Sequence, residues 1–171
     1  MHEVALSSDR FDKPTGRSST TFAPPPPPAA ARFSVCQEIA VLWGDIDALG
    51  HVNNTRYFGW LEETRLVYLR MIGVDLSTGA SQTPVLASTS VDFLRPVFWP
   101  DSVRVEGKTT RLGRTSLTMD YRVTSVGQQA VVATGSAVVV LLAPNTGRPV
   151  PIPDLIRDAI RRLDPDARDT L

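Results

Sequence analysis

The groups best suited to chemistry lie close together in residues 43–57, which read WGDIDALGHVNNTRY. Two carboxylates, one imidazole and two amides fall within ten positions: Asp45, Asp47, His51, Asn53 and Asn54. Such groups act as acids, bases or hydrogen-bond partners. The segment lies between a strand-like pattern and the most regular helical pattern of the chain. A helix that begins there would point free backbone N–H groups toward a ligand.

The spacing of Asp45, Asp47 and Gly50 also matches the start of a calcium-binding EF-hand loop. That loop needs another oxygen ligand at its fifth position and a glutamate at its twelfth, where this chain has Leu49 and Arg56. No cysteine accompanies His51 in this segment, so the segment has no zinc-binding set either. We therefore expect no metal at this site.

The overall composition narrows the class of partner. Eighteen basic and eighteen acidic residues leave no net charge, which argues against nucleic acid or an anionic membrane as the main partner. The single cysteine, Cys36, suits a reducing compartment. No run approaches the roughly 18 apolar residues of a membrane span, and the first residues lack the apolar core of a secretory signal. We expect a cytoplasmic protein.

Residues 1–32 look like an appendage. They include five consecutive prolines at positions 24–28, which favour an extended polyproline II conformation and cannot enter a helix interior or a central strand. We predict a disordered, proline-rich tail over residues 1–32 and one domain over residues 33–171. A ligand for a proline-recognition module is the alternative reading of the proline run.

The apolar spacing predicts a strand followed by one long helix. Residues 33–43 alternate as a half-buried strand that places Trp43 on the buried face. The helix should begin at a cap supplied by Asn53 or Asn54 and end at Gly73. Its many apolar side chains predict burial on most sides.

Strand patterns dominate the rest of the chain. They cover residues 84–94, 102–110, 115–123 and 130–142. Asp154 should cap a last short helix that carries Leu155 on its apolar face. A run of strands after one helix favours an α+β fold with an antiparallel sheet, and wrapping the sheet around the helix would bury both.

With this order of elements, residues 43–57 and 60–65 (WLEETR) make the chain resemble the hotdog-fold thioesterases of the 4-hydroxybenzoyl-CoA thioesterase type. Residues 93–96 (FLRP) and 112–117 (LGRTSL) are weaker matches. The likeness covers residues 33–142. It implies a hotdog fold, an antiparallel sheet wrapped around one central helix, and hydrolysis of an acyl-CoA without a cofactor, because CoA is part of the substrate.

In that family a loop carboxylate attacks the thioester carbonyl or activates water, and the central helix N-terminus binds the oxyanion. The resemblance assigns these roles to Asp47 and to the backbone N–H near Asn54. Plant acyl-carrier-protein thioesterases are similar across the loop; their histidine falls on His51, whereas their asparagine is not matched. Another branch carries its carboxylate on the central helix, which corresponds to Glu62 or Glu63.

These residue types suit the chemistry. A carboxylate in a partly dry pocket becomes more basic, and one well-aimed oxyanion donor contributes about 3 kcal/mol in the transition state. Thiolate leaves readily, so little acid catalysis is needed. Other roles stay open: Asp47 could cap a turn, His51 could bond to backbone, and Glu63 could pair with an arginine.

Seven further residues are candidates for holding the substrate: Tyr57, Trp60, Arg95, Arg111, Arg114, Thr115 and Ser116. The aromatic side chains would line the acyl pocket or the core. The arginines lie beside predicted turns, where they could hold phosphates of CoA or be plain surface charges. The two hydroxyl groups could hydrogen-bond the carrier arm. The expected substrate is an acyl thioester of CoA or of an acyl-carrier protein.

A single unit of this fold leaves one helix face and an edge strand uncovered, which predicts a homodimer or a dimer of dimers. Its sites would lie at the interface, with Glu62, Glu63 or Arg65 near the partner. Two other functions remain open, a hotdog hydratase or dehydratase and a non-catalytic acyl-thioester binding protein.

Overall fold

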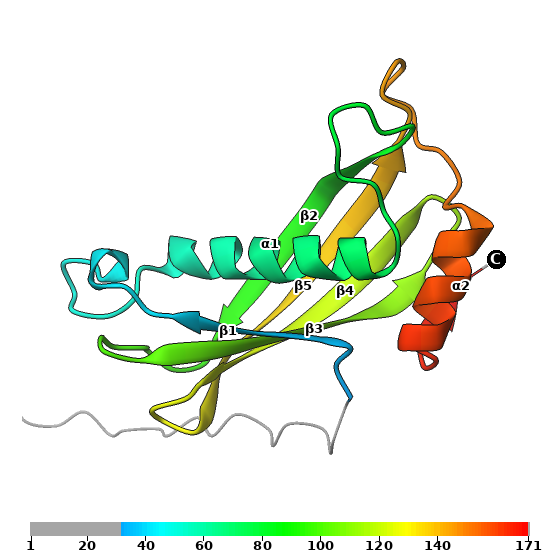
Figure 1. The fold of residues 1–171 in the computed structure, drawn as a ribbon. Helices are drawn as coiled ribbons and strands as arrows, with labels where there is room; N and C mark the ends of the chain where they lie inside the picture. Colours follow the sequence, from blue (N-terminus) through cyan, green and yellow to red (C-terminus); the bar gives the residue numbers. More distant parts are fainter. Residues whose placement is uncertain (1–31, 171) are drawn as a thin grey trace, which may run out of the picture.

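The computed structural model describes residues 32–170, in which an antiparallel sheet curves around one long helix (Figure 1). The elements in chain order are β1 (Val35–Ala40), the 3-10 turn η1 (Trp43–Asp45), α1 (Asn54–Met71), β2 (Thr83–Phe93), β3 (Ser102–Leu112), β4 (Ser116–Ser125), β5 (Ala130–Leu142), α2 (Asp154–Leu163) and β6 (Arg168–Asp169). The predicted α+β hotdog fold is confirmed. The predicted tail lies outside the described residues, apart from Arg32.

The strands are ordered β1-β3-β4-β5-β2, and every pair along this path is antiparallel. β1 pairs with the first half of β3, from Ala40 opposite Ser102 to Val35 opposite Gly107. The short β6, which no sequence pattern indicated, pairs in parallel with the far end of β3. β2 therefore forms one edge of the sheet, and β1 together with β6 forms the other.

α1 packs its inner face on the sheet. Its buried residues recur every three or four positions: Tyr57, Trp60, Leu61, Thr64, Arg65, Tyr68 and Leu69. The expectation of burial on most sides is wrong for the single chain, because one sheet can cover only one helix face. Phe58 and Met71 on the outer side are 39% and 48% exposed.

The helix ends at the predicted glycine. Gly73 has a φ of +85°, its N–H donates to the carbonyl of Arg70, and the N–H of Val74 donates to that of Leu69. These two bonds form a Schellman motif, which satisfies carbonyls that the helix leaves unpaired.

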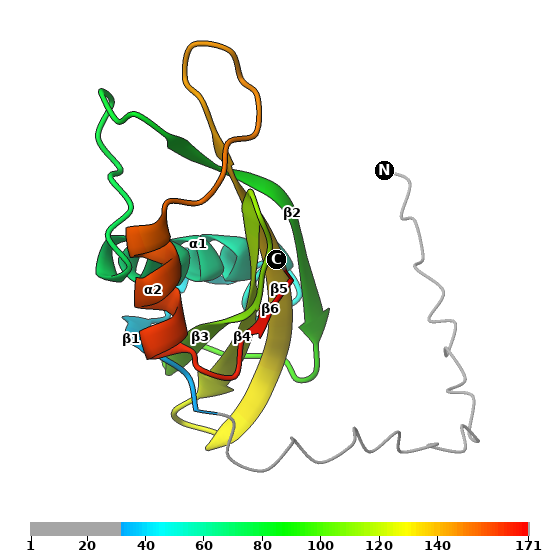
Figure 2. The ribbon, with the colours of Figure 1, turned by 90° about the vertical axis from the view of Figure 1, so that its right-hand side faces the viewer.

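The C-terminal segment closes the end of the sheet away from the start of α1 (Figure 2). Asp164, just after α2, is buried and accepts hydrogen bonds from the hydroxyl of Tyr68 at 2.7 Å, the N–H of Thr109 at 2.9 Å and the hydroxyl of Ser34. One carboxylate thus joins α2 to α1, to β3 and to the residue that precedes β1. Because both oxygens of the Asp164 carboxylate accept hydrogen bonds, the cost of burying its charge is offset.

Three local expectations are wrong. Trp43 is 77% exposed, because the strand ends at Ala40 and η1 turns the side chain outward. Asp154 does not cap α2; Pro153 is the N-cap and no side chain bonds there, so Asp154 is the first helical residue. Leu155 is 84% exposed, because the buried stripe of α2 runs through Arg157 and Ile160 instead.

Within residues 32–170, no helix is both long and apolar enough to cross a membrane.

Candidate active site

The loop between η1 and α1 is a short antiparallel turn that ends in the helix. The N–H of Asn53 donates to the carbonyl of Asp45 at 2.8 Å, and that of Asp47 donates to the carbonyl of His51 at 3.0 Å. Gly50 takes a φ of +83° at the tip, a conformation that glycine adopts without strain. These rungs bring Asp47 and His51 face to face.

The Asp47 carboxylate divides its two oxygens between different partners. Oδ1 accepts the N–H of Leu49 at 2.8 Å, which is the turn-capping role left open above. Oδ2 lies 3.7 Å from Nδ1 of His51, a ring nitrogen that is also 3.4 Å from the carbonyl of Val52. The two side chains are 21% and 32% exposed, so water can reach both of them.

The start of α1 leaves one amide available. The side chain of Asn53 caps the helix by accepting the N–H of Thr55 at 2.9 Å, and the N–H of Arg56 donates to the carbonyl of Asn53. The first helical N–H, that of Asn54, forms no hydrogen bond within residues 32–170. Such an amide, at the positive end of the helix dipole, suits a developing negative charge.

A pocket of ≈ 240 Å³ opens at the start of α1, with Asn54 in its lining. His51, Val52, Asn54 and Tyr57 line one side, and residues 93–96 line the other. The ring of Tyr57 meets that of Phe93 edge-on, with centroids 5.1 Å apart. Burial raises the pKa of Tyr57 to about 12, so its hydroxyl stays neutral even at pH values where an ordinary tyrosine ionises.

Of the predicted substrate residues, Tyr57 and Arg95 line this pocket. Trp60 is buried and packs behind Tyr57, with ring centroids 4.9 Å apart, so it supports the wall rather than forming it. Arg95 is exposed at the rim and has no carboxylate partner within the described part of the chain.

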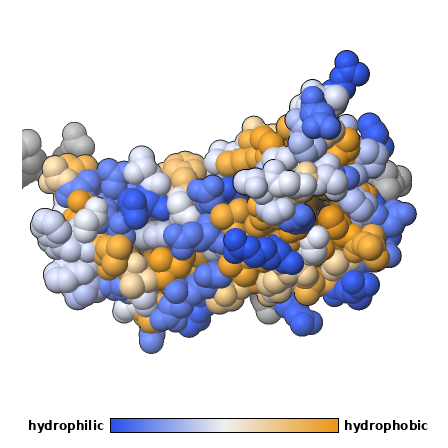
Figure 3. Space-filling model, turned by 45° about the horizontal axis from the view of Figure 1, so that its top comes forward, coloured by the Kyte–Doolittle hydropathy of each residue, from blue (hydrophilic) through white to orange (hydrophobic). Residues whose placement is uncertain are grey.

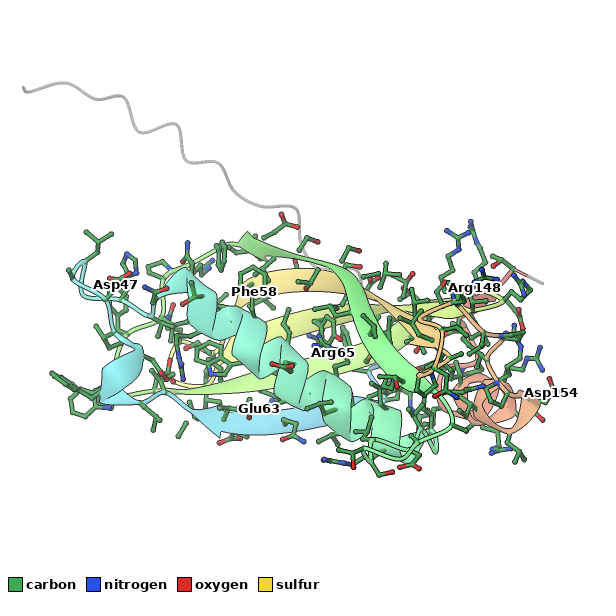
Figure 4. All side chains as sticks on the ribbon, turned by 90° about the horizontal axis from the view of Figure 1, so that it is seen from above. Asp47, Phe58, Glu63, Arg65, Arg148 and Asp154 are labelled. Carbon is green, nitrogen blue, oxygen red and sulfur yellow. The ribbon has the colours of Figure 1, made fainter. Side chains whose placement is uncertain are left out.

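The other candidates lie elsewhere in the same chain. β3 starts beside the loop, where the N–H of Val41 donates to the carbonyl of Asp101, and then runs for about 33 Å away from it. Arg111, Arg114, Thr115 and Ser116 surround the turn at its far end. Figure 4 shows the same separation between Asp47 at one end of the molecule and Arg148 and Asp154 at the other.

Glu63 is also distant from the pocket. It lies on α1, about 14 Å farther along the helix axis than Asn54, and its side chain is exposed. Neither it nor its neighbour Glu62 lines the pocket, and Glu62 lies 3.9 Å from the guanidinium of the buried Arg65.

Sequence reasoning missed that Phe93, Leu94 and Pro96 complete the pocket. They belong to the weak family match at residues 93–96, which was a usable signal, but only the fold brings that segment beside α1. In the part of the chain that the structure describes, no group of three or more His, Cys, Asp or Glu side chains is arranged to hold a metal ion.

Residues 41–160 match the sequence model of the thioesterase-like superfamily. The chain is 30% identical over 118 residues to the uncharacterised protein YsmA of Bacillus subtilis, covering 69% of this chain and 79% of YsmA. It is 26% identical over 123 residues to 1,4-dihydroxy-2-naphthoyl-CoA hydrolase of Synechococcus elongatus, covering 69% of this chain and 88% of that protein. A solved thioesterase from Thermus thermophilus, complexed with coenzyme A and Zn, is 39% identical over 78% of this chain and 96% of that one, with a TM-score of 0.68.

Proposed function

The chain belongs to the thioesterase-like superfamily, and from that premise we propose that it hydrolyses acyl-CoA thioesters to a free acid and CoA. The proposal rests on the pocket at the start of α1, where an apolar wall meets an unpaired helix amide and the imidazole of His51. Asp47 does not line the pocket itself; its Oδ2 lies 3.7 Å from Nδ1 of His51, which does. The activities for which the Synechococcus hydrolase and the Thermus thioesterase are named support it. The narrower assignment to the 4-hydroxybenzoyl-CoA thioesterase type is also a proposal, and it rests on the sequence of residues 43–57.

In the proposed reaction, Asp47 takes a proton from water while the water oxygen attacks the thioester carbonyl carbon. Oδ2 suits this role, because Oδ1 already accepts the N–H of Leu49. In the alternative, Asp47 attacks the carbonyl itself and water opens the resulting anhydride. On either route the carbonyl oxygen becomes negative, the N–H of Asn54 stabilises it, and the tetrahedral intermediate expels CoA thiolate, which then takes up a proton.

His51 and the pocket walls have supporting roles in this scheme. The imidazole lies 3.7 Å from Oδ2, which supports a role in orienting the carboxylate or the attacking water. The acyl group would lie against Tyr57 and Phe93, and Arg95 at the rim would pair with a negative group on the carrier. The carrier is CoA or an acyl-carrier protein, and the reaction requires no cofactor.

We propose that the active form is at least a homodimer. The edge strand β2 and the adjoining surface expose large apolar side chains, including Val85, Leu86, Phe93 and Leu94, and Figure 3 shows apolar patches between polar ones on the face seen there. An unpaired, apolar edge is a surface on which a second copy can add a strand. A partner could also bring the distant candidates Arg111, Arg114, Thr115, Ser116 and Glu63 toward the pocket of the first copy.

A panel of acyl-CoA esters tests the activity. Purified protein should release free thiol from at least one aliphatic or aryl ester, at the same rate with and without a metal chelator. No release above background on any ester would overturn the proposal. Hydration of crotonyl-CoA would identify a hydratase instead, and ligand-induced thermal stabilisation without hydrolysis would identify a binding protein. A cytoplasmic location is part of the proposal, and fractionation of cells expressing the full chain tests it.

A further inference from the structure

Asp45 is a buried carboxylate that the proposed reaction does not use. It is 3% exposed, and it makes three attachments to different parts of the chain. Oδ2 accepts the N–H of Leu42 at 2.9 Å, Oδ1 lies 2.6 Å from Nε of Arg56, and the backbone carbonyl accepts the N–H of Asn53 at 2.8 Å. One residue thus holds the strand that enters the loop, the base of the loop and the first turn of α1.

These attachments surround the two groups that the reaction needs. Asp45 lies two residues before Asp47, and Arg56 lies two residues after Asn54. The loop between them closes through the Ile46–Val52 bridge and the Asp47–His51 rung. The tip of the loop carries the carboxylate of Asp47. The base of the loop continues into α1, which supplies the N–H of Asn54. The ion pair between Asp45 and Arg56 joins the loop base to the helical turn, beside the bonds that Asn53 accepts from the N–H groups of Thr55 and Arg56.

The ion pair is asymmetric in its exposure. The side chain of Asp45 is 4% exposed and that of Arg56 is 49% exposed. A buried carboxylate is costly unless it is paired, so Asp45 holds Arg56 against the loop, whereas Arg56 alone would be free to point into solvent. Removing Arg56 would leave the buried Asp45 carboxylate without its cation, so the loss of either partner should disturb the loop.

From this geometry we infer that Asp45 and Arg56 form a positioning pair for thioester hydrolysis: they fix the N–H of Asn54 relative to the Asp47 carboxylate. The inference rests on the proposed function. Neither residue lines the pocket, and the Asp45 carboxylate is already engaged by the N–H of Leu42 and the guanidinium of Arg56, so we assign neither residue a contact with the reacting atoms. Their effect is on turnover, because a displacement of about 1 Å between catalytic groups can cost on the order of 100-fold in rate.

The kinetic test compares Asp45→Asn with Glu106→Gln. Glu106 forms an ion pair with Arg122, at 2.8 Å, on strands β3 and β4 away from the pocket, and its side chain is 17% exposed. Both changes convert a paired carboxylate into an amide. At a temperature where both variants are fully folded, Asp45→Asn should lower kcat by roughly 10- to 100-fold with little change in KM, and Glu106→Gln should leave both constants unchanged. A purely structural role of Asp45 would lower the melting temperature and leave kcat of the folded enzyme intact, which would overturn the inference.

Substitutions of Arg56, the exposed partner, test whether the effect on kcat depends on the positive charge of its side chain. Arg56→Gln should reproduce the loss in kcat, and Arg56→Lys should restore part of it, because lysine keeps a cation near the carboxylate. The double variant Asp45→Asn/Arg56→Gln should be no slower than the worse single variant, since both changes break the same contact. Additive losses would overturn the pairing.

Backbone hydrogen exchange tests the positioning without reference to activity. In Asp45→Asn, the amides of residues 45–56 should exchange faster than in the wild type, whereas in Glu106→Gln they should not. Unchanged exchange in this segment would overturn the inference. If the wild type hydrolyses no acyl-CoA, the proposed function fails, and the exchange result still decides whether the pair fixes the loop to the helix.

Discussion

The carboxylate of Asp47 and the imidazole of His51 lie 3.7 Å apart at the tip of the loop that leads into α1. The backbone rung between the same two residues holds them opposite each other, and Gly50 makes the tight turn between them. Since Oδ1 is occupied by the N–H of Leu49, the oxygen that faces His51 is the one available for chemistry.

We expect Asp47→Asn to lower the turnover of acyl-CoA by about 100-fold or more, because a general base contributes at least that much. The amide oxygen can still accept the N–H of Leu49, so the loop and the melting temperature should change little. Thiol release and a thermal melt on the same preparation measure the two effects.

Unchanged turnover in Asp47→Asn would contradict the assignment and would transfer the role of base to Glu63. In that case Glu63→Gln should be the inactive variant. If Asp47 is the base, Glu63→Gln should retain most of the wild-type rate, because its side chain is exposed and distant from the pocket within one chain.

We expect the double variant Val85→Lys/Leu86→Lys to weaken self-association. These side chains are 39% and 40% exposed on the edge strand β2, and charges on an edge oppose pairing with a second copy. Light scattering should give at least a dimer for the wild type and a larger monomer fraction for the variant. Val126→Lys is the matched control, since Val126 is 37% exposed at the turn between β4 and β5. A monomeric wild type at working concentration would refute the prediction.

We expect the free energy of unfolding to fall as pH rises above about 10. Burial raises the pKa of Tyr57 and Tyr121 to about 12 and also raises that of Tyr68, and these are the three tyrosines of the chain. An unfolded tyrosine titrates near pH 10, so above that pH the unfolded state binds fewer protons than the folded state. The stabilisation that these raised pKa values give the folded state is complete below pH about 10. It is lost as pH approaches about 12. Urea titrations at several pH values measure the free energy of unfolding. The absorbance of tyrosinate measures the ionisation of the folded protein, and tyrosinate that appears near pH 10 in the folded protein would contradict the prediction.

We expect two glycine-to-alanine changes to have opposite effects on stability. A Cβ at Gly135 would lie 2.9 Å from the carbonyl oxygen of Ser90 and 3.0 Å from Cδ1 of Leu61, so Gly135→Ala should destabilise by about 1–3 kcal/mol. A Cβ at Gly59 would meet nothing within 4 Å, and Gly59→Ala should stabilise α1 by about 0.5–1 kcal/mol. Denaturant unfolding measures both. A tolerated Gly135→Ala would mean that both β2 and α1 can shift away from β5 at this position.

Several elements were predictable because their signals are local. The strand over residues 130–142 was predicted with the bounds that β5 has, and the helix was predicted to begin at an asparagine cap and end at Gly73. A cap, a left-handed glycine and an alternating pattern each act over a few residues. Trp43 failed because alternation does not reveal where a strand stops, and Asp154 failed because the cap formed one residue earlier.

The sequence by itself determined the fold class, the long helix and the chemical groups of residues 45–54, since those groups are near neighbours along the chain. Only the tertiary structure decided which distant segments share the pocket. It brought residues 93–96 beside Tyr57 and carried Arg111 and Arg114 to the opposite end, because β3 pairs with β1 at the loop and then runs away from it. It also decided that Asp45 ties the loop to the helix. Such pairings depend on strand order and register, which join residues far apart in the sequence and which local patterns do not specify.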